Sequence, residues 1–372
     1  MIFYLTYNDA LSGIFRSQVI DVVNFLNGEF KASVRLVVFA SIRNFKSEKS
    51  KIKSYLPNAI VVPMFPKVKN WKWNILTLRV LCLLYKPNKI IGRSVLATSM
   101  ALNIKKSNPG LKVVYDGRGA IAAEWKEYNV VKDEYLISNI HKWESEVVNK
   151  SDFCLAVSNK LVEHWRNEFG YNKNNYVVIP CTLEKSFREQ DLSEGNSIRQ
   201  ELGIKNDDVF YIYSGSVAGW QSMELMTSFF KIILSNKNAK VLFLSSKTEF
   251  IEDLQKQFPS QVKCIRVEFE KVPAYLSAGD YGILIREKTI TNKVASPVKF
   301  AEYLSSGLKV IISEEIGDYS EFVISNNCGY LFNSIKSDLP PLNLSERERN
   351  KSLSNLFFKE YFKKEYSQLL LS

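Results

Sequence analysis

The sequence predicts a mixed α/β protein made of two doubly wound domains, each with a parallel sheet covered by helices on both faces. Three observations support this prediction. Short, nearly continuous apolar runs alternate with segments whose apolar residues recur at helical spacing, as in parallel strands joined by crossover helices. The alternation occurs twice, in two series separated by the polar segment Glu184–Asn196. The length of 372 residues also fits two domains, because single cores usually stop growing at about 250–300 residues.

The first series holds seven expected strands, each a short run rich in β-branched, aromatic or aliphatic residues. They are Ile2–Thr6, Val34–Ala40, Ile60–Val62, Lys89–Ile91, Leu111–Asp116, Phe153–Val157 and Tyr176–Ile179. The spacing of apolar residues predicts helices at Ser17–Asn27, Trp73–Tyr85, Ala97–Ser107 and Asp133–Lys150. We expect this series to form an N-terminal domain over residues 1–183, onto which a C-terminal helix at about 352–372 packs back.

The second series predicts a C-terminal domain over residues 184–351. Its expected strands are Val209–Ser214, Lys240–Ser245, Val262–Val267, Tyr281–Ile285 and Lys309–Ile312. In the stretch 295-ASPVKFAEYLSSGLKVIIS-313, Phe300, Tyr303 and Leu304 share one helical face, and Gly307 can take the left-handed conformation that ends a helix. Parallel sheets bind ligands beyond the carboxyl ends of their strands. The residues that follow each strand are therefore expected to line a cleft between the two domains.

The composition is that of a globular protein, with 46% hydrophobic and 24% charged residues. Five scattered cysteines form no C-x-x-C pair, which excludes the common zinc and redox motifs and indicates a reducing compartment. The opening MIFYLTYNDA has no basic segment before a long apolar one, and no apolar run approaches 18 residues. We therefore expect a cytoplasmic protein, at most peripheral on the inner face of the plasma membrane.

The formal net charge of +11 indicates an acidic partner, which can be nucleic acid, anionic lipid or a phosphorylated small substrate. No helix-turn-helix, zinc-finger or RNP1 pattern is present, so nothing supports sequence-specific binding of nucleic acid. Lysines gather with tryptophans in Arg43–Lys53 and Lys67–Trp73, a composition that suits an anionic membrane surface. A solvated basic face is the alternative reading of these two segments.

Small residues follow the first strand of the C-terminal domain. Ser214, Gly215 and Ser216 form a turn just before a helix that starts near Ser222. Backbone N–H groups at such a turn can bind phosphate, and the alternative is an ordinary tight strand–helix loop.

Cations follow the strand Tyr281–Ile285. Arg286, Lys288, Lys293 and Lys299 come after it, with Ser296 and Pro297 opening the next helix. They predict an anion site, although a basic surface loop is the alternative. A carboxylate one turn into that helix would repel phosphate, so Glu302 suits another role, that of accepting hydrogen bonds from the vicinal diol of a ribose.

In the N-terminal domain, Asp116, Arg118 and Glu124 follow a strand, and Gly13 follows the first strand, where it lets the backbone come close to a ligand. The Asp-Gly pair can instead be only a turn. The two histidines, His141 and His164, are expected to be surface or packing residues. No cluster of His, Cys and carboxylate predicts a metal, and no cofactor is expected.

Six segments, taken together and in order, resemble the bacterial GT-B glycosyltransferases of the family-4-like group, with the closest likeness between Tyr211 and Phe332. The segments are YDGRGAIAAEW, SDFCLAVSNKL, VIPCTLEKSF, YSGSVAGWQSME, VPAYLSAGDYGILI and SPVKFAEYLSSGLKVI. The resemblance implies two facing Rossmann-like domains and the transfer of a sugar from a nucleotide-sugar donor to a glycan or lipid-linked acceptor, in the synthesis of a bacterial surface polysaccharide. It implies that Glu302 is the second Glu of the E-x7-E motif, which binds the ribose, and that the expected anion is the donor diphosphate.

The resemblance also assigns roles to site residues. The donor would be bound by Ser214, Gly215, Ser216, Arg286, Lys293, Ser296, Pro297, Lys299 and Glu302. The acceptor would be bound by Gly13, Asp116, Arg118 and Glu124, and the catalytic residues would be Lys299, Arg286 and Asp116. The chain departs from the pattern at two places, since Val294 stands where the first Glu is usual and the usual Arg is missing from the Ser216–Trp220 loop.

No pair of carboxylates is placed for a double displacement, so a protein nucleophile is not expected. The expected reaction is metal-independent and front-face: the departing diphosphate takes the acceptor's proton, and the anomeric configuration is retained. A catalytic-base role for Asp116 would instead indicate inversion. The alternatives are a transferase with a non-nucleotide phosphorylated donor, a sugar phosphorylase or a nucleotide-sugar epimerase. A basic, non-catalytic protein that binds membranes or nucleic acid is the alternative of another class.

Overall fold

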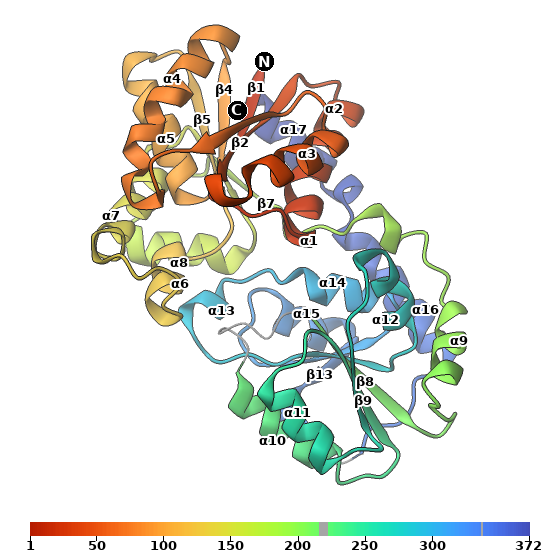
Figure 1. Cartoon of the computed structure of the whole chain (residues 1–372). Helices are drawn as coiled ribbons and strands as arrows, with labels where there is room; N and C mark the ends of the chain where they lie inside the picture. Colours follow the sequence, from red (N-terminus) through yellow and green to blue (C-terminus); the bar gives the residue numbers. More distant parts are fainter. Residues whose placement is uncertain (216–221, 336–337) are drawn as a thin grey trace. The chain divides into compact units, whose positions relative to one another are not determined.

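The structure is a computed structural model. It describes residues 1–215, 222–335 and 338–372 (Figure 1). The chain divides into two compact units. Unit 1 comprises Met1–Thr182, Val294–Ser296 and Phe362–Ser372, and unit 2 comprises Leu183–Lys293 and Pro297–Tyr361. Of the C-terminal segment expected to return to the first domain, Phe362–Ser372 belongs to unit 1 and the preceding part belongs to unit 2.

Unit 1 contains a seven-stranded sheet in the order β3-β2-β1-β4-β5-β6-β7, with every neighbouring pair parallel. Its strands are β1 (Ile2–Tyr7), β2 (Val34–Ser41), β3 (Ile60–Met64), β4 (Lys89–Arg93), β5 (Lys112–Gly117), β6 (Phe153–Ala156) and β7 (Tyr176–Val178). The prediction of a doubly wound parallel sheet is confirmed, and every expected strand of this series is present.

The helices of unit 1 connect these strands. They are α1 (Gly13–Phe15), α2 (Asp21–Glu29), α3 (Phe45–Tyr55), α4 (Asn74–Tyr85), α5 (Ser94–Ser107), α6 (Ile121–Glu127), α7 (Glu134–Lys150), α8 (Asn159–Phe169) and α17 (Lys363–Leu371). The helix predicted at Ser17–Asn27 is present, within a helical stretch that is continuous over residues 13–29; its first residues belong to a π-helical turn, Arg16–Ile20, and the rest to α2. Side chains cap three of these helices at their N-termini, because Ser12 accepts from Phe15 N, Asp133 accepts from Leu136 N and Ser158 accepts from Leu161 N.

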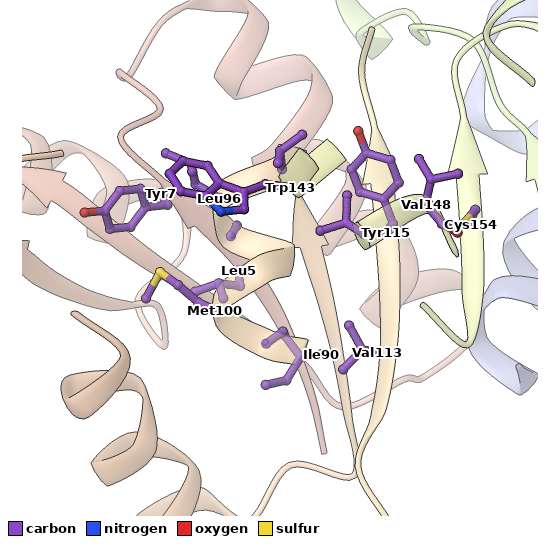
Figure 2. Close-up of a cluster of buried hydrophobic side chains, with 14 of the residues drawn as sticks. Leu5, Tyr7, Ile90, Leu96, Met100, Val113, Tyr115, Trp143, Val148 and Cys154 are labelled. Atoms are coloured by element: carbon purple, nitrogen blue, oxygen red, sulfur yellow. Dashed lines mark hydrogen bonds between the residues drawn. The ribbon is translucent and has the colours of Figure 1, made fainter. Parts of the chain in front are cut away.

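Both faces of this sheet are buried, which explains why its strands are nearly continuous apolar runs. Figure 2 shows one face, where Leu5, Ile90 and Val113 from neighbouring strands lie in one buried cluster with Met100 of α5 and Trp143 of α7. Side chains that point to the other face of the sheet form a second buried cluster. Its strand residues include Tyr4, Leu36, Ile91 and Val114, and they pack with Val23 of α2 and Tyr366 of α17.

The last helix, α17, is held on unit 1 by its C-terminus as well as by its apolar face. Tyr366 and Leu369 are buried in the core, and Lys89 Nζ donates to the carbonyl oxygens of Leu369 (3.0 Å) and Leu370 (2.7 Å). A cation at this end of a helix satisfies carbonyl groups that have no partner within the helix. Burial lowers the pKa of Lys89 to about 8.

Unit 2 contains a six-stranded parallel sheet in the order β10-β9-β8-β11-β12-β13. Its strands are β8 (Val209–Ser214), β9 (Ala239–Leu244), β10 (Val262–Ile265), β11 (Tyr281–Leu284), β12 (Lys309–Ile312) and β13 (Gly329–Leu331). Its helices are α9 (Glu194–Glu201), α10 (Met223–Ile233), α11 (Glu249–Gln257), α12 (Val272–Ser277), α13 (Ile290–Lys293), α14 (Val298–Ser305), α15 (Tyr319–Asn326) and α16 (Leu344–Leu353). The edge strand β13 was not predicted, because it has three residues, begins with a glycine and is only partly buried.

Each sheet has one place where the strand order reverses, between β1 and β4 in unit 1 and between β8 and β11 in unit 2. At such a switch point the connections leave in opposite directions, which opens a crevice beyond the carboxyl ends of the two strands. Across the described residues, no helix is both long enough and apolar enough to cross a membrane.

Candidate functional site

The site in unit 2 begins at the carboxyl end of β8. Gly215 follows this strand with a φ of +113°, and its N–H donates to Leu244 O at 3.0 Å. A β-carbon at this position would lie 2.6 Å from Lys299 Nζ. The positive φ favours glycine at position 215, and the end of the flexible lysine side chain fills the space that a β-carbon would take.

Helix α14 is fixed against this strand end by Tyr303. The Tyr303 hydroxyl accepts a hydrogen bond from Ser214 N (3.0 Å) and donates one to Ile283 O (3.2 Å), so it joins α14 to both β8 and β11. Its ring lies over Gly282, where no β-carbon could be accommodated. Lys299 lies four residues before Tyr303 and therefore on the same helical face. This arrangement directs the lysine toward the β8–β11 switch point.

Lys299 reaches the switch point without forming an ion pair within the described residues. Its ammonium lies 4.6 Å from the centroid of the Tyr213 ring, and within the described part of the chain no ion pair or hydrogen bond engages it. Burial, and to a smaller extent the neighbouring Arg286, lower the pKa of Lys299 to about 7, while Glu302 acts in the opposite direction. An anion beside this ammonium would restore its charge.

Arg286 is the second cation of the site and follows β11. Its backbone N–H donates to Ser313 Oγ (2.8 Å), and its Nη1 donates to Asn292 Oδ1 (3.3 Å). Asn292 is fully buried and donates in turn to Glu287 O at 3.1 Å. The position of the guanidinium is thus set by a buried amide that is itself anchored to the backbone.

Glu302 lies three residues after Lys299 on α14. Burial raises the pKa of Glu302 to about 7, Glu184 adds to the rise, and the Lys299 ammonium opposes it. Within the described residues no hydrogen bond engages the Glu302 carboxyl group. It is therefore a half-buried acceptor that can be either protonated or ionised near neutral pH.

Three further residues predicted to bind the donor lie in other surroundings, and a fourth is not described. Lys293 is exposed and forms an ion pair with Glu315 at 2.8 Å. Ser296 belongs to unit 1, where its Oγ accepts from Cys181 N at 2.9 Å, and Pro297 directly precedes α14 in unit 2. Ser216 lies outside the described residues.

In unit 1, Asp116 and Arg118 belong to a buried network at the end of β5. The Asp116 carboxylate accepts from the Tyr4 hydroxyl and lies 3.7 Å from Arg93 Nη1 and 3.5 Å from Arg118 Nε. Arg93, at the end of β4, also pairs with Asp9 at 2.9 Å. Asp116 thus serves as the counter-ion of two guanidinium groups, an environment that suits a positioning role better than proton transfer.

The other two residues predicted to bind the acceptor lie on short helices of unit 1. Gly13 opens α1, where Ser12 Oγ accepts from Phe15 N at 3.2 Å. Glu124 lies in α6, and the first N–H groups of that helix donate to the buried Glu144 at 3.0 and 2.7 Å. Burial raises the pKa of Glu144 to about 7.

The positioning roles of several residues were not predicted from the sequence. Tyr303 aligns α14, Asn292 and Ser313 hold Arg286, and Arg93 and Tyr4 hold Asp116. For two of these residues the sequence contains a pattern from which the role could have been predicted. Tyr303 is at i+4 from Lys299, and Arg93 ends a strand next to the strand that carries Asp116. Among the described residues, no group of three or more His, Cys, Asp or Glu side chains could hold a metal ion.

Solved structures of similar fold cover nearly the whole chain. HepE from Anabaena, solved with UDP and also with UDP-glucose, matches with a TM-score of 0.73 in the UDP complex, over 99% of each chain, at 12% identity. WaaG, a glycosyltransferase involved in lipopolysaccharide biosynthesis, matches with a TM-score of 0.65 over 100% of each chain, at 12% identity. A Listeria monocytogenes protein assigned as a UDP-N-acetylglucosamine 2-epimerase matches with a TM-score of 0.54 over 99% of this chain and 90% of that one, at 9% identity.

At these identities the likeness establishes the fold. The two doubly wound units form the GT-B fold, as the resemblance of the sequence implied. No protein-family model matches the chain, and neither does any curated protein sequence.

Proposed function

We propose that this GT-B chain is a glycosyltransferase that moves a sugar from a nucleotide-sugar donor to a glycan or lipid-linked acceptor in the synthesis of a bacterial surface polysaccharide. One observation carries the proposal. Lys299, which forms no ion pair within the described residues, lies against Gly215 and beside Arg286 at the switch point of unit 2. HepE, which has the same fold, was solved with UDP and UDP-glucose, and WaaG is a glycosyltransferase of lipopolysaccharide biosynthesis.

In the proposed reaction, Lys299 and Arg286 bind the donor diphosphate, and Glu302 accepts hydrogen bonds from the ribose. The Ser214 and Gly215 N–H groups already donate to the Tyr303 hydroxyl and to Leu244 O, so the two side-chain cations carry the diphosphate contact. The bond between the anomeric carbon and the diphosphate oxygen breaks, and negative charge develops on the leaving group. Two fixed cations in a partly buried site stabilise that charge more strongly than they would in water. No divalent ion is needed in this scheme, because the side chains supply the positive charge.

The acceptor hydroxyl attacks from the face on which the diphosphate departs and passes its proton to a diphosphate oxygen. The new bond then has the same anomeric configuration as the donor. On unit 1 we propose that Arg118 and Glu124 contact the acceptor, while Asp116 holds Arg118 in place. NMR of the product decides this step. Retention and full activity in EDTA are expected, and an inverted product or loss of activity in EDTA would contradict the scheme.

A nucleotide-sugar epimerase is the second candidate, because the epimerase-assigned protein of Listeria monocytogenes shares the fold. The two histidines give this candidate no support. His141 pairs with Glu168 at 2.8 Å, and both histidines pack edge-on against Phe169, on helices α7 and α8 rather than at strand ends. The transferase is therefore the function that this site supports better.

The depressed pKa of Lys299 predicts how nucleotide binding depends on pH. A bound diphosphate favours the charged ammonium, so above pH 7 binding must take up a proton. We expect the affinity for the correct nucleoside diphosphate to fall by up to about tenfold per pH unit between pH 7.5 and 9, where the diphosphate is already fully ionised. Calorimetry should show this fall in the wild type and in Glu302→Gln. A fall of equal slope in Lys299→Met would contradict the assignment.

A second prediction concerns the ribose. If Glu302 accepts from both ribose hydroxyls, Glu302→Ala should weaken binding of a ribonucleotide donor by about tenfold or more, and Glu302→Gln, which keeps an acceptor oxygen, should weaken it less. The 2′-deoxy donor should be less sensitive to the substitution, because one of the two hydrogen bonds is already absent. A double-mutant-type cycle with both donors measures this coupling, and equal sensitivity would rule out the ribose contact.

A further inference from the structure

The outer face of helix α4 is apolar. Ile75, Leu78 and Leu81 pack into the core of unit 1, as expected of a helix that covers a sheet. The opposite side carries four aliphatic side chains that are 54–70% exposed: Leu76, Val80, Leu83 and Leu84. Helix α4, drawn in orange in Figure 1, is therefore apolar on both sides.

The four exposed side chains form one continuous stripe, because their positions relative to Leu76 are i, i+4, i+7 and i+8. Trp73, which is 65% exposed, directly precedes the helix and extends the stripe at its start. Helices on a protein surface normally turn a polar face outward, whereas a contiguous exposed apolar patch marks a surface that another body covers.

Positive charge surrounds this stripe. Residues 49–115 contain thirteen Lys and Arg and no Asp or Glu, whereas the rest of the chain contains 37 Lys and Arg against 39 Asp and Glu. The whole positive excess of the chain therefore lies in the stretch that contains α4. Four exposed cations flank the stripe and form no ion pair within the described residues: Lys67, Lys69, Arg79 and Lys86.

We propose that α4 and the preceding segment 67–73 form a docking surface for an anionic lipid bilayer. The helix would lie along the membrane surface, with Leu76, Leu83 and Leu84 in the apolar part of the interface and the lysines at the headgroups. Trp73 suits the boundary between the two layers. With 12 residues, α4 is about 18 Å long, which fits a helix lying in the interface.

Two other occupants fit the surface less well. A second copy of this chain, related by a two-fold axis, would bring the same uncompensated cations toward one another. Nucleic acid would satisfy the cations but would leave the exposed leucines against a charged phosphate backbone. An anionic bilayer accommodates both the apolar stripe and the cations at once.

The proposal goes beyond the transfer reaction and does not depend on it, because α4 belongs to unit 1 and the cationic site described above belongs to unit 2. Flotation of the full chain with phosphatidylcholine vesicles, with and without phosphatidylglycerol, tests it. We expect the protein to float only with the anionic vesicles. The binding should weaken as salt is raised, because each cation near the surface contributes about fivefold to the affinity.

Two variants separate the apolar and the charged contributions. Leu83→Ser/Leu84→Ser should lower the affinity for anionic vesicles by about tenfold or more, and Lys67→Gln/Lys69→Gln/Arg79→Gln should lower it by on the order of a hundredfold. Ile324→Ser is the matched control, because Ile324 is 63% exposed on α15 of unit 2. It should float like the wild type. All these positions are exposed, so the melting temperature should not change.

Three outcomes with vesicles and in light scattering would overturn the proposal. They are the absence of flotation with anionic vesicles at low salt, unchanged flotation of Leu83→Ser/Leu84→Ser, and a dimer of the wild type that this double variant dissociates in light scattering. Binding to nucleic acid without binding to vesicles would also overturn it. Nucleotide binding by the same samples, measured separately, reports on the transfer site and not on the docking surface.

Discussion

Lys299→Ala is expected to weaken binding of the correct nucleoside diphosphate by about ten- to a hundredfold, because a hydrogen bond to a charged group is worth about 1.5–3 kcal/mol. The structure gives the reason for choosing this lysine. It lies against Gly215 and next to Arg286, and no ion pair within the described ranges competes for its ammonium. Turnover should fall at least as far as affinity, because the same ammonium stabilises charge on the leaving group.

Lys293→Ala is the matched control for this prediction. Lys293 is six positions away in the chain and equally basic, but its ammonium is exposed and pairs with Glu315. Its replacement should change the affinity by less than about twofold, since exposed ion pairs contribute little. Isothermal titration calorimetry of both variants measures the difference. Equal affinities for the two alanine variants would remove Lys299 from the donor site.

Asp280→Ala is expected to reduce the free energy of unfolding by about 3–5 kcal/mol, the largest effect on stability that we predict. Asp280 lies at the amino end of β11 and is 1% exposed. Its carboxylate accepts from Arg199 Nη1 (3.2 Å), Arg347 Nη2 (2.7 Å), Phe210 N (2.8 Å) and Leu342 N (3.1 Å). Alanine would leave two largely buried guanidinium groups without their shared counter-ion.

Urea denaturation followed by circular dichroism measures this loss, with Asp207→Ala as control. Asp207 is exposed, so its replacement should change the free energy of unfolding by no more than about 0.5 kcal/mol. The loss of unfolding free energy in Asp280→Asn should lie between the losses in Asp280→Ala and Asp207→Ala, because asparagine keeps an acceptor oxygen but loses the charge. A wild-type unfolding curve for Asp280→Ala would show that the two arginines find other partners.

The fold was largely predictable because strands buried on both faces of a parallel sheet leave a simple pattern in the sequence. The nearly continuous apolar runs at Val34–Ser41 and Val209–Ser214 clearly indicate buried strands. The failures have physical reasons as well. The edge strand Gly329–Leu331 gains most of its order from pairing with β12 rather than from its own composition. The π-helical turn at Arg16–Ile20 follows from tertiary packing, since most of its side chains are buried.

The site was predictable only as far as strand ends indicate it. Arg286 follows a strand and Lys299 lies on a predicted helix, so both could be named from the sequence. Side-chain partners could not be named in this way. The exposed ion pair of Lys293 with Glu315, the Tyr303 hydroxyl between two strands and the buried partners of Asp116 depend on contacts between residues far apart in the sequence.

The most direct test of the central claim is to incubate the protein with UDP-, GDP-, ADP- and CMP-sugars and follow both the free nucleoside diphosphate or monophosphate and the nucleotide-linked sugar by NMR. The account predicts that one donor binds and releases its nucleotide, slowly to water and faster to an acceptor, and that Lys299→Ala lowers this release by about tenfold or more. Conversion of the sugar while it stays attached to the nucleotide would contradict the account and indicate an epimerase. Failure of every nucleotide sugar to bind the wild type would contradict it as well.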